Sequence, residues 1–201
     1  MTNTSRKTRT TVEIGMLGAI ATVLMLFEFP LPFIAPPFYE LDFSEVPVLI
    51  GAFALGPMAG ATIELVKILL NLLLGGTNTA FVGEIANYLI GCSFILPAAF
   101  IYQKRKSKKT ALLGMVAGII IMTIFGCLMN AYVLLPTYAT AFGMPVDTII
   151  EMGSAVNANI HNIFSFVLIA VAPFNIFKGI VVSFITMLLY KHVSPILKGT
   201  R

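Results

Sequence analysis

The stretch Lys104-Arg105-Lys106-Ser107-Lys108-Lys109 places five cations within six residues, and long apolar segments flank it on both sides. Eleven of the thirteen Lys and Arg residues fall into this cluster and two others near the chain ends: Arg6, Lys7 and Arg9, then Lys191, Lys198 and Arg201. Because cationic loops of membrane proteins stay in the cytoplasm, we expect all three clusters on one side, separated by even numbers of spans. All nine acidic residues fall between the clusters, and seven of them lie where the chain turns on the far side: Glu28, Glu40, Asp42, Glu45, Glu84, Asp147 and Glu151.

The composition also indicates a membrane protein. Of the 201 residues, 58% are hydrophobic and 11% are charged, and the mean hydropathy is +0.93. This is too apolar for a soluble domain, and the length suits one helical bundle, so we expect a single domain over residues 1–201. The net charge of +4 does not predict a nucleic-acid partner, because the cations flank apolar spans and form no surface stripe. Cys92 and Cys127 lie inside apolar runs, which predicts packing residues and no disulfide or metal site.

The apolar segments predict six transmembrane helices, each needing about 20 residues to cross a bilayer. We expect them at about Val12–Phe29, from a Ser44 cap to the Gly56-Pro57 stop, and at about Pro57–Leu74, Phe81–Tyr102, Thr110–Leu135 and Pro173–Tyr190. The second is too short for a lipid-facing span and is expected to be buried among its neighbours.

The segment after Pro136 is expected to be an outer loop containing a short helix over Val146–Met152. The apolar segment Ile163–Ala172 either extends the sixth helix or lies re-entrant beneath the loop. We interpret the first apolar run as a retained helix, because no small-residue cleavage site follows it. With six spans, both termini are cytoplasmic.

Polar residues within the predicted spans gather toward their outer ends: Asn71, Glu84, Asn87, Asn130, Asn175 and Lys178. Residues three apart share a helix face, so Asn175 with Lys178, and Glu84 with Asn87, can point at one ligand. Polar side chains are costly in hydrocarbon, which makes the cluster a candidate site, although interhelical hydrogen bonding explains any single Asn equally well. An amide offers a donor and an acceptor in one plane, which suits a heterocycle edge with alternating carbonyl and N–H groups.

Three further patterns have two interpretations each. The stretch Phe38–Phe43 alternates aromatic or apolar residues with acidic ones, which predicts either a lid over the site or an interfacial aromatic belt. Glu64 and Lys67 lie three apart nearer mid-membrane, where a structural ion pair is favoured over a proton pathway. The first helix carries small residues on one face, which suit either a neighbouring helix or another protein: Gly15, Gly18, Ala19 and Thr22. The glycines of the third and fifth helices predict packing within the bundle.

Motifs of several function classes are absent from the sequence. It contains no G-x-x-x-x-G-K-[ST] phosphate loop, no H-E-x-x-H and no G-x-S-x-G, which disfavours an enzyme and excludes ATP hydrolysis by a P-loop. No internal repeat indicates an inverted-repeat secondary transporter. A six-helix chain with an outward pocket and no energy source of its own is typical of a binding subunit that needs partners.

Four blocks of sequence then carry a resemblance to a known family: residues 41–47 (LDFSEVP), 65–67 (LVK), 130–136 (NAYVLLP) and 173–179 (PFNIFKG). In this order they resemble the riboflavin-specific substrate-binding subunits, or S components, of bacterial energy-coupling factor (ECF) transporters. The similarity runs from the first helix to Tyr190. It implies an all-α integral membrane protein with the six-helix S-component fold in the bacterial cell membrane. The implied partners are riboflavin, a transmembrane coupling (T) subunit and two ATP-binding-cassette ATPases, with no cofactor.

The resemblance also implies roles for residues. Asn130, Asn175 and Lys178 would hold the flavin, with a contribution from the loop around Glu40, Leu41 and Asp42. The first-helix face would meet the coupling subunit, with Gly15 and Gly18 partly replacing alanine. The implied mechanism is capture of riboflavin from outside, loop closure and rotation of the whole subunit in the membrane when the partners use ATP. Binding of another vitamin is the nearest alternative, and a proton-coupled carrier resting on Glu64 and Lys67 is the alternative from a different class.

Overall fold

The computed structural model describes residues 3–77, 79–141, 143 and 145–198, so Arg201 of the third cationic cluster lies outside the described residues. Its elements are helical apart from one pair of two-residue strands, β1 and β2. In chain order they are α1 (Asn3–Met25), β1 (Phe29–Pro30), β2 (Glu40–Leu41), α2 (Glu45–Leu55), α3 (Pro57–Gly75), α4 (Val82–Lys104), α5 (Lys108–Met129), η1 (Asn130–Leu134), α6 (Leu135–Ala141), α7 (Val146–Val156), α8 (Ile163–Phe166), η2 (Val167–Val171) and α9 (Ala172–Lys198). The η elements are π-helical turns.

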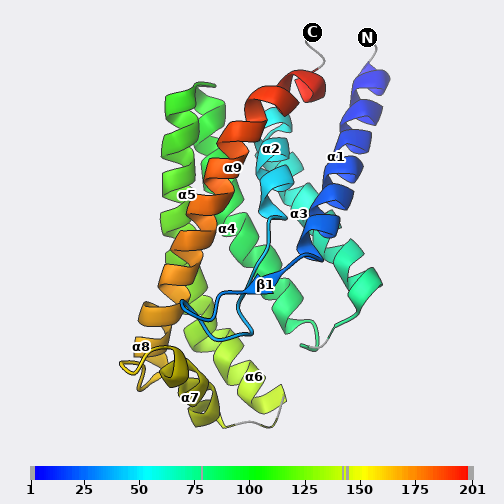
Figure 1. Ribbon diagram of the computed structural model, residues 1–201. Coiled ribbons are helices and arrows are strands. Elements are labelled where there is room, and N and C mark those ends of the chain that lie inside the picture. Colours follow the sequence, from blue (N-terminus) through cyan, green and yellow to red (C-terminus); the bar gives the residue numbers. More distant parts are fainter. Residues whose placement is uncertain (1–2, 78, 142, 144, 199–201) are drawn as a thin grey trace.

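The helices run alternately up and down one bundle (Figure 1). The first and last helices, α1 and α9, place the two ends of the chain at the same end of the bundle, where α4 also turns into α5. The cationic segments therefore gather at that end. The β1–β2 loop and the short helices α6, α7 and α8 lie at the opposite end.

Four helical segments of the described chain are long and apolar enough to cross a membrane: Pro57–Gly75, Val82–Lys104, Lys108–Thr140 and Ile163–Pro195. The chain is thus a predominantly helical membrane protein. The helix α2 is apolar but has only 11 residues. All residues from Glu45 to Phe53 are buried, which confirms the prediction that this short helix lies among its neighbours.

Local sequence accounts for several helix ends. Gly56 has φ = +114°, a conformation that favours glycine, and Pro57 starts α3 at a position where its missing N–H costs nothing. Ser107 caps α5, because its side chain accepts from the backbone N–H of Thr110 in a capping box. Ser44 was predicted to cap α2 in the same way. Ser44 does occupy the N-cap position of α2, but it makes no side-chain cap bond, and its hydroxyl instead accepts from Nζ of Lys67.

The predicted helix bounds differ from the structure at several ends: the first helix begins at Asn3 and not at Val12, and the last continues to Lys198 and not to Tyr190. Two further differences have a local cause. The first helix ends at Met25 and not at Phe29, because Phe29 precedes Pro30, is biased to extended backbone and pairs with Leu41 in β1–β2. The fifth helix was predicted to stop at Pro136, yet the chain stays helical through η1 into α6. A proline clashes with the carbonyl four residues earlier, and the wider π-turn just before Pro136 relieves that clash.

The ambiguous segment Ile163–Ala172 extends the last helix, through α8 and η2 into α9. Its π-turn η2 ends two residues before Pro173, just as η1 ends two residues before Pro136. The two π-turns contact each other. Since π-turns inside helices are often found at functional sites, this pair marks one region of the bundle.

Candidate functional site

Two adjoining cavities open where the β1–β2 loop meets α4, α5 and α9. The first has a volume of about 210 Å³ and the second about 570 Å³. They share six lining residues: Glu28, Phe38, Glu40, Gly83, Asn87 and Tyr138. Together the volumes fall in the range of small-molecule sites, roughly 300–1,000 Å³. The first cavity alone lies below that range, so a ligand of this size would need both.

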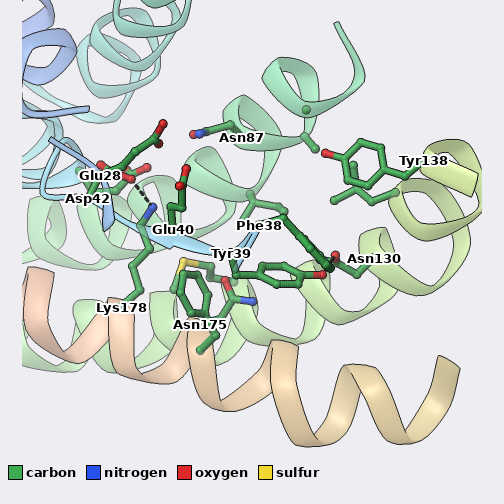
Figure 2. Close-up of a pocket in the computed structure, with 17 residues that line it drawn as sticks. Glu28, Phe38, Tyr39, Glu40, Asp42, Asn87, Asn130, Tyr138, Asn175 and Lys178 are labelled. Carbon is green, nitrogen blue, oxygen red and sulfur yellow. Dashed lines mark hydrogen bonds and ion pairs between the residues drawn. The ribbon is translucent and has the colours of Figure 1, made fainter. Parts of the chain in front are cut away.

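An ion pair ties the loop to α9 at one end of the first cavity (Figure 2). Nζ of Lys178 donates to Oδ2 of Asp42 at 2.9 Å, and the two side chains are 14% and 4% exposed. The backbone N–H of Ser44 donates to the other Asp42 oxygen. Burial alone would raise the pKa of the Asp42 carboxyl, but the charges of Lys178 and Lys67 and these hydrogen bonds outweigh it and hold the pKa below its usual range.

Two buried amides lie toward the other end of the cavity. Asn130 is the first residue of η1, and Asn175 lies one turn after η2. Each donates from Nδ2 to the carbonyl four residues earlier in its own helix, Gly126 at 2.8 Å and Val171 at 3.0 Å. Tyr39 from the loop donates its hydroxyl to Oδ1 of Asn130. The structure thus uses one amide hydrogen of each Asn to hold its side chain in place, and it turns the oxygen of Asn130 toward the Tyr39 hydroxyl.

Aromatic rings line the same end. Tyr39 is tilted against Phe174, with ring centroids 5.6 Å apart, and against Phe38, 4.8 Å apart. Phe38 is stacked on Phe166 at 6.5 Å. The rings of Phe38, Tyr39 and Phe174 all line the first cavity, so the predicted lid stretch does face the site. Flat apolar surfaces beside amide groups suit a planar heterocycle, which stacks on its faces and forms hydrogen bonds at its edge.

Carboxylates surround the second cavity. Glu84 accepts from the Thr79 hydroxyl at 2.8 Å, and it shares this cavity with Asn87 and Asn71, as their helix faces predict. Glu28 and Glu40 line both cavities. Glu28 is exposed at the protein surface, but its partial desolvation and the negative charge of Glu40 raise its pKa to about 7. This carboxyl therefore titrates near neutral pH.

The ion pair of Glu64 and Lys67 is structural, as favoured from the sequence, but it has a third member. Nζ of Lys67 lies 2.7 Å from Oε1 of Glu64 and 3.1 Å from Oε1 of Glu45, and the Lys67 and Glu64 side chains are fully buried. The same ammonium donates to Ser44 and, at 3.5 Å, to Asn87. A buried cation with this many acceptors is held in place, which does not suit a mobile proton carrier.

The structure brings most of the predicted site residues together. Those that line the first cavity are Glu40, Asp42, Asn87, Asn130, Asn175 and Lys178, and those that line the second include Asn71, Glu84 and Asn87. Leu41 lines neither cavity. It is buried in a hydrophobic cluster with Leu31, Leu135 and Phe174, where it anchors the loop.

The four small residues of α1 lie on neighbouring rows of one helix face, of which only part packs within the bundle. Gly18 packs against Val66 of α3, and the hydroxyl of Thr22 donates to the carbonyls of Gly18 and Lys67. Gly15 and Ala19, at the adjacent edge of the same face, are exposed. Residues 15 and 19 form one row along the helix and residues 18 and 22 form the adjacent row, so α3 covers the second row and leaves the first exposed.

Several lining residues were missed from the sequence, notably Glu28, Glu45, Met122, Tyr138 and Phe174. Glu28 and Glu45 flank the loop and carry a signal, because each is a charged residue next to an apolar span. Met122 and Phe174 carry none, since apolar residues in apolar helices look alike wherever they point.

Comparisons with known proteins agree on one family. The family model described as "ECF transporter, substrate-specific component" matches residues 9–190. The chain belongs to this family of S components. Among its relatives, the riboflavin transporter RibU of Staphylococcus aureus (strain TCH60) is 39% identical over 188 residues, which cover 93% of this chain and 91% of the relative. The riboflavin transporter FmnP of Bacillus subtilis (strain 168) is 33% identical over 196 residues, 97% of each chain.

A solved structure supports the fold of this S component. The S component of a bacterial ECF transporter matches it with a TM-score of 0.73 at 39% sequence identity, over 96% of this chain and 99% of that chain. The relatives are transporter subunits and not enzymes. The resemblance inferred from the four sequence blocks is therefore confirmed at the level of the family.

Proposed function

We propose that this S component binds riboflavin at the two cavities and delivers it across the membrane as part of an ECF-type importer. The observation that carries the proposal is the meeting of Asn130, Asn175 and Lys178 on one cavity beside the rings of Tyr39 and Phe174. Relatives that cover nearly the whole chain are riboflavin transporters. Riboflavin has a planar ring system with carbonyl and N–H groups along one edge and a chain of hydroxyls, which matches this set of groups.

In the proposed binding mode the loop is a lid. It is held down by three contacts that a ligand would compete with or reinforce: the Tyr39–Asn130 bond, the Asp42–Lys178 pair and the β1–β2 pairing. Entry of a solute would require at least one of them to open. Discrimination between vitamins then depends on hydrogen bonds, because apolar contact alone separates similar ligands poorly.

The energy for transport would come from partners. We propose that this chain works with a transmembrane coupling subunit and two ATP-binding-cassette ATPases, as its family membership supports. The exposed positions Gly15 and Ala19 of α1 are the proposed meeting point, since small residues let a partner helix approach closely. Gly18 and Thr22 would support that helix from behind through α3.

The proposed topology has six spans, formed by α1, α2, α3, α4, α5 with α6, and α8 with α9. Both termini and the cationic α4–α5 turn would be cytoplasmic, because cationic loops stay on that side. The cavities would then open on the outer side, where the vitamin is captured.

A ligand titration tests the proposed function. The full chain is purified in detergent, stripped of bound flavin, and titrated with riboflavin, FMN, thiamine and biotin while flavin fluorescence or heat is recorded. We expect saturable binding of riboflavin at one site and no binding of thiamine or biotin. Saturable binding of thiamine or biotin with none of riboflavin would overturn the assignment and favour a different vitamin.

A further inference from the structure

Glu45 is a buried carboxylate that lines the first cavity and has only half of its hydrogen bonding satisfied. Its side chain is 4% exposed. One oxygen, Oε1, accepts from Lys67 at 3.1 Å, while Oε2 has no hydrogen-bond partner among the described residues. An unpaired oxygen on a buried charged group is costly. Oε2 of Glu64 is unpaired as well, but Glu64 lines neither cavity, so of these two carboxylates only Glu45 can meet a donor from outside the chain.

The neighbours of Glu45 cannot supply that donor. The ammonium of Lys67 has three protons, and four acceptors already surround it: Glu64, Glu45, Ser44 and Asn87. On the side of α4, Gly91 has no side chain that could donate, and a Cβ there would collide with Oε1 of Glu64 and lie 3.0 Å from Oε1 of Glu45. Glu45 lines the first cavity, so a solute bound there is the nearest source of a donor outside the chain, and the carboxyl would turn Oε2 from its closed position toward that space.

The same ammonium sets the orientation of Asn87. Lys67 only donates, so the oxygen of the Asn87 amide faces Nζ, at 3.5 Å, and its NH₂ group is left for the cavities that Asn87 lines. A carboxylate acceptor and an amide donor thus lie on either side of one buried cation. This arrangement matches a solute that presents a donor and an acceptor close together.

We propose that Glu45 is a further ligand-binding residue, whose carboxylate accepts a hydrogen bond from an N–H or O–H group of the bound solute. Lys67 is its positioning residue, which holds Glu45 and Asn87 and is itself buried from the ligand. The inference rests on the proposed function, in which the solute is a flavin. A flavin offers two kinds of donor, the ring N–H and the hydroxyls of its side chain. Because a carboxylate accepts only, this position selects for a solute that has a donor there.

The test compares two isosteric variants of the same ion cluster. Glu45→Gln changes a residue that lines the cavity. Glu64→Gln neutralises the second carboxylate that contacts Lys67, and Glu64 is not among the described residues that line either cavity. Affinities of the full-length proteins are measured for riboflavin, for N3-methylriboflavin, which lacks the ring N–H, and for lumiflavin, which lacks the hydroxyl chain. Thermal midpoints without ligand report on folding.

We expect Glu45→Gln to lower riboflavin affinity about 10- to 100-fold, as for loss of a hydrogen bond to a charged group, and Glu64→Gln to change it less than about threefold. The loss in Glu45→Gln should shrink to less than about threefold for the one analogue that lacks the bonded donor. This pattern would distinguish a ligand contact from a structural effect of the cluster.

Two results would overturn the inference. One is unchanged riboflavin affinity in Glu45→Gln, and the other is an equal loss in Glu45→Gln and Glu64→Gln for all three ligands. If Glu45→Gln does not fold, Glu45→Asp keeps the charge beside Lys67 but withdraws the carboxylate, and it should show the same loss. The wild-type protein tests the proposed function separately. If it fails to bind riboflavin, the proposed function itself is wrong.

Discussion

Gly126 is the residue that lets the two site amides meet. A Cβ on Gly126 would lie 3.0 Å from Nδ2 of Asn175, and the carbonyl of Gly126 accepts the amide hydrogen of Asn130. The absence of a side chain therefore brings α5 close to α9 at the depth of the π-turns. Both Asn side chains are buried, and each uses one amide hydrogen within its own helix. This leaves Oδ1 of Asn175 as an acceptor to which no described side chain donates.

Replacing Lys178 or Asn175 by Ala should weaken riboflavin binding by about 1.5–3 kcal/mol, the range for hydrogen bonds that involve charged groups. The Lys178 variant also leaves Asp42 buried without its cation. The lid then loses one of its contacts, and the ligand loses a hydrogen-bond donor. The measurement is the dissociation constant of each purified variant. Lys191→Ala, an exposed cation near the end of the same helix, is the matched control. Unchanged affinity in both site variants would remove these residues from the site.

At the scale of the elements, the sequence predicted helix positions well where the bundle is regular and poorly where the site lies. The bounds of α3 and α4 match within two residues, because Gly-Pro and Gly-Gly mark their ends. The π-turns were not predicted, because a proline in a sequence predicts the end of a helix, and the sequence does not show that a π-turn before it lets the helix continue. The role of Tyr39 was also open, because its partner Asn130 is 91 residues away in sequence.

The contact between α4 and α5 depends on glycines that face backbone atoms. A Cβ on Gly114 would lie 2.5 Å from the carbonyl oxygen of Ala98, and one on Gly118 equally close to that of Phe94. We expect Gly114→Ala to lower the free energy of unfolding by about 1–3 kcal/mol, because the backbone must shift despite the better helix propensity of Ala. Gly15→Ala is the control, since nothing lies within 4 Å of its Cβ. Unfolding in detergent would measure both, and equal midpoints would contradict this account of the interface.

The loop should be less stable at higher pH because of Glu28. Its folded pKa of about 7 lies above the ordinary value of 4.5, so its contribution to stability is fully present below pH 4.5 and is lost as pH rises through 7. The charged groups that face it are Glu40 and Asp42, which raise the pKa, and Lys178, which lowers it. We expect the thermal midpoint of the ligand-free protein to fall between pH 4.5 and 7. Glu28→Gln should flatten this part of the profile, and an identical slope in the variant would assign it to other groups.

At the scale of the whole molecule, the short helix α2 makes room for the site. Eleven residues give a helix of about 16 Å, roughly half the hydrocarbon thickness of a bilayer. The remaining depth on that side is occupied by the β1–β2 loop (Figure 1), and residues of this loop line both cavities. The sequence predicted that α2 is short and buried, but not that the missing half of the span is a binding site, because no local pattern encodes an empty volume.

The distribution of cations makes a further prediction about the whole molecule, its orientation. The cationic α4–α5 turn lies at one end of the bundle and the α7–α8 turn at the other (Figure 1). Cationic loops are retained in the cytoplasm, so the α7–α8 turn should be outside. Both positions can be probed with single cysteines, Lys106→Cys and Ala158→Cys, which replace exposed residues.

In a background of Cys92→Ala and Cys127→Ser, a membrane-impermeant maleimide added to intact cells should label Ala158→Cys and leave Lys106→Cys unlabelled until the membrane is permeabilised. Serine at position 127 keeps a donor for the carbonyl of Val167, which Cys127 contacts at 3.5 Å. The cysteine-free parent controls for background labelling. Labelling of Lys106→Cys in intact cells would show that the topology is the reverse of the proposed one. The cavities would then face the cytoplasm in the resting protein, and capture of a vitamin from outside would require the subunit to turn over before binding.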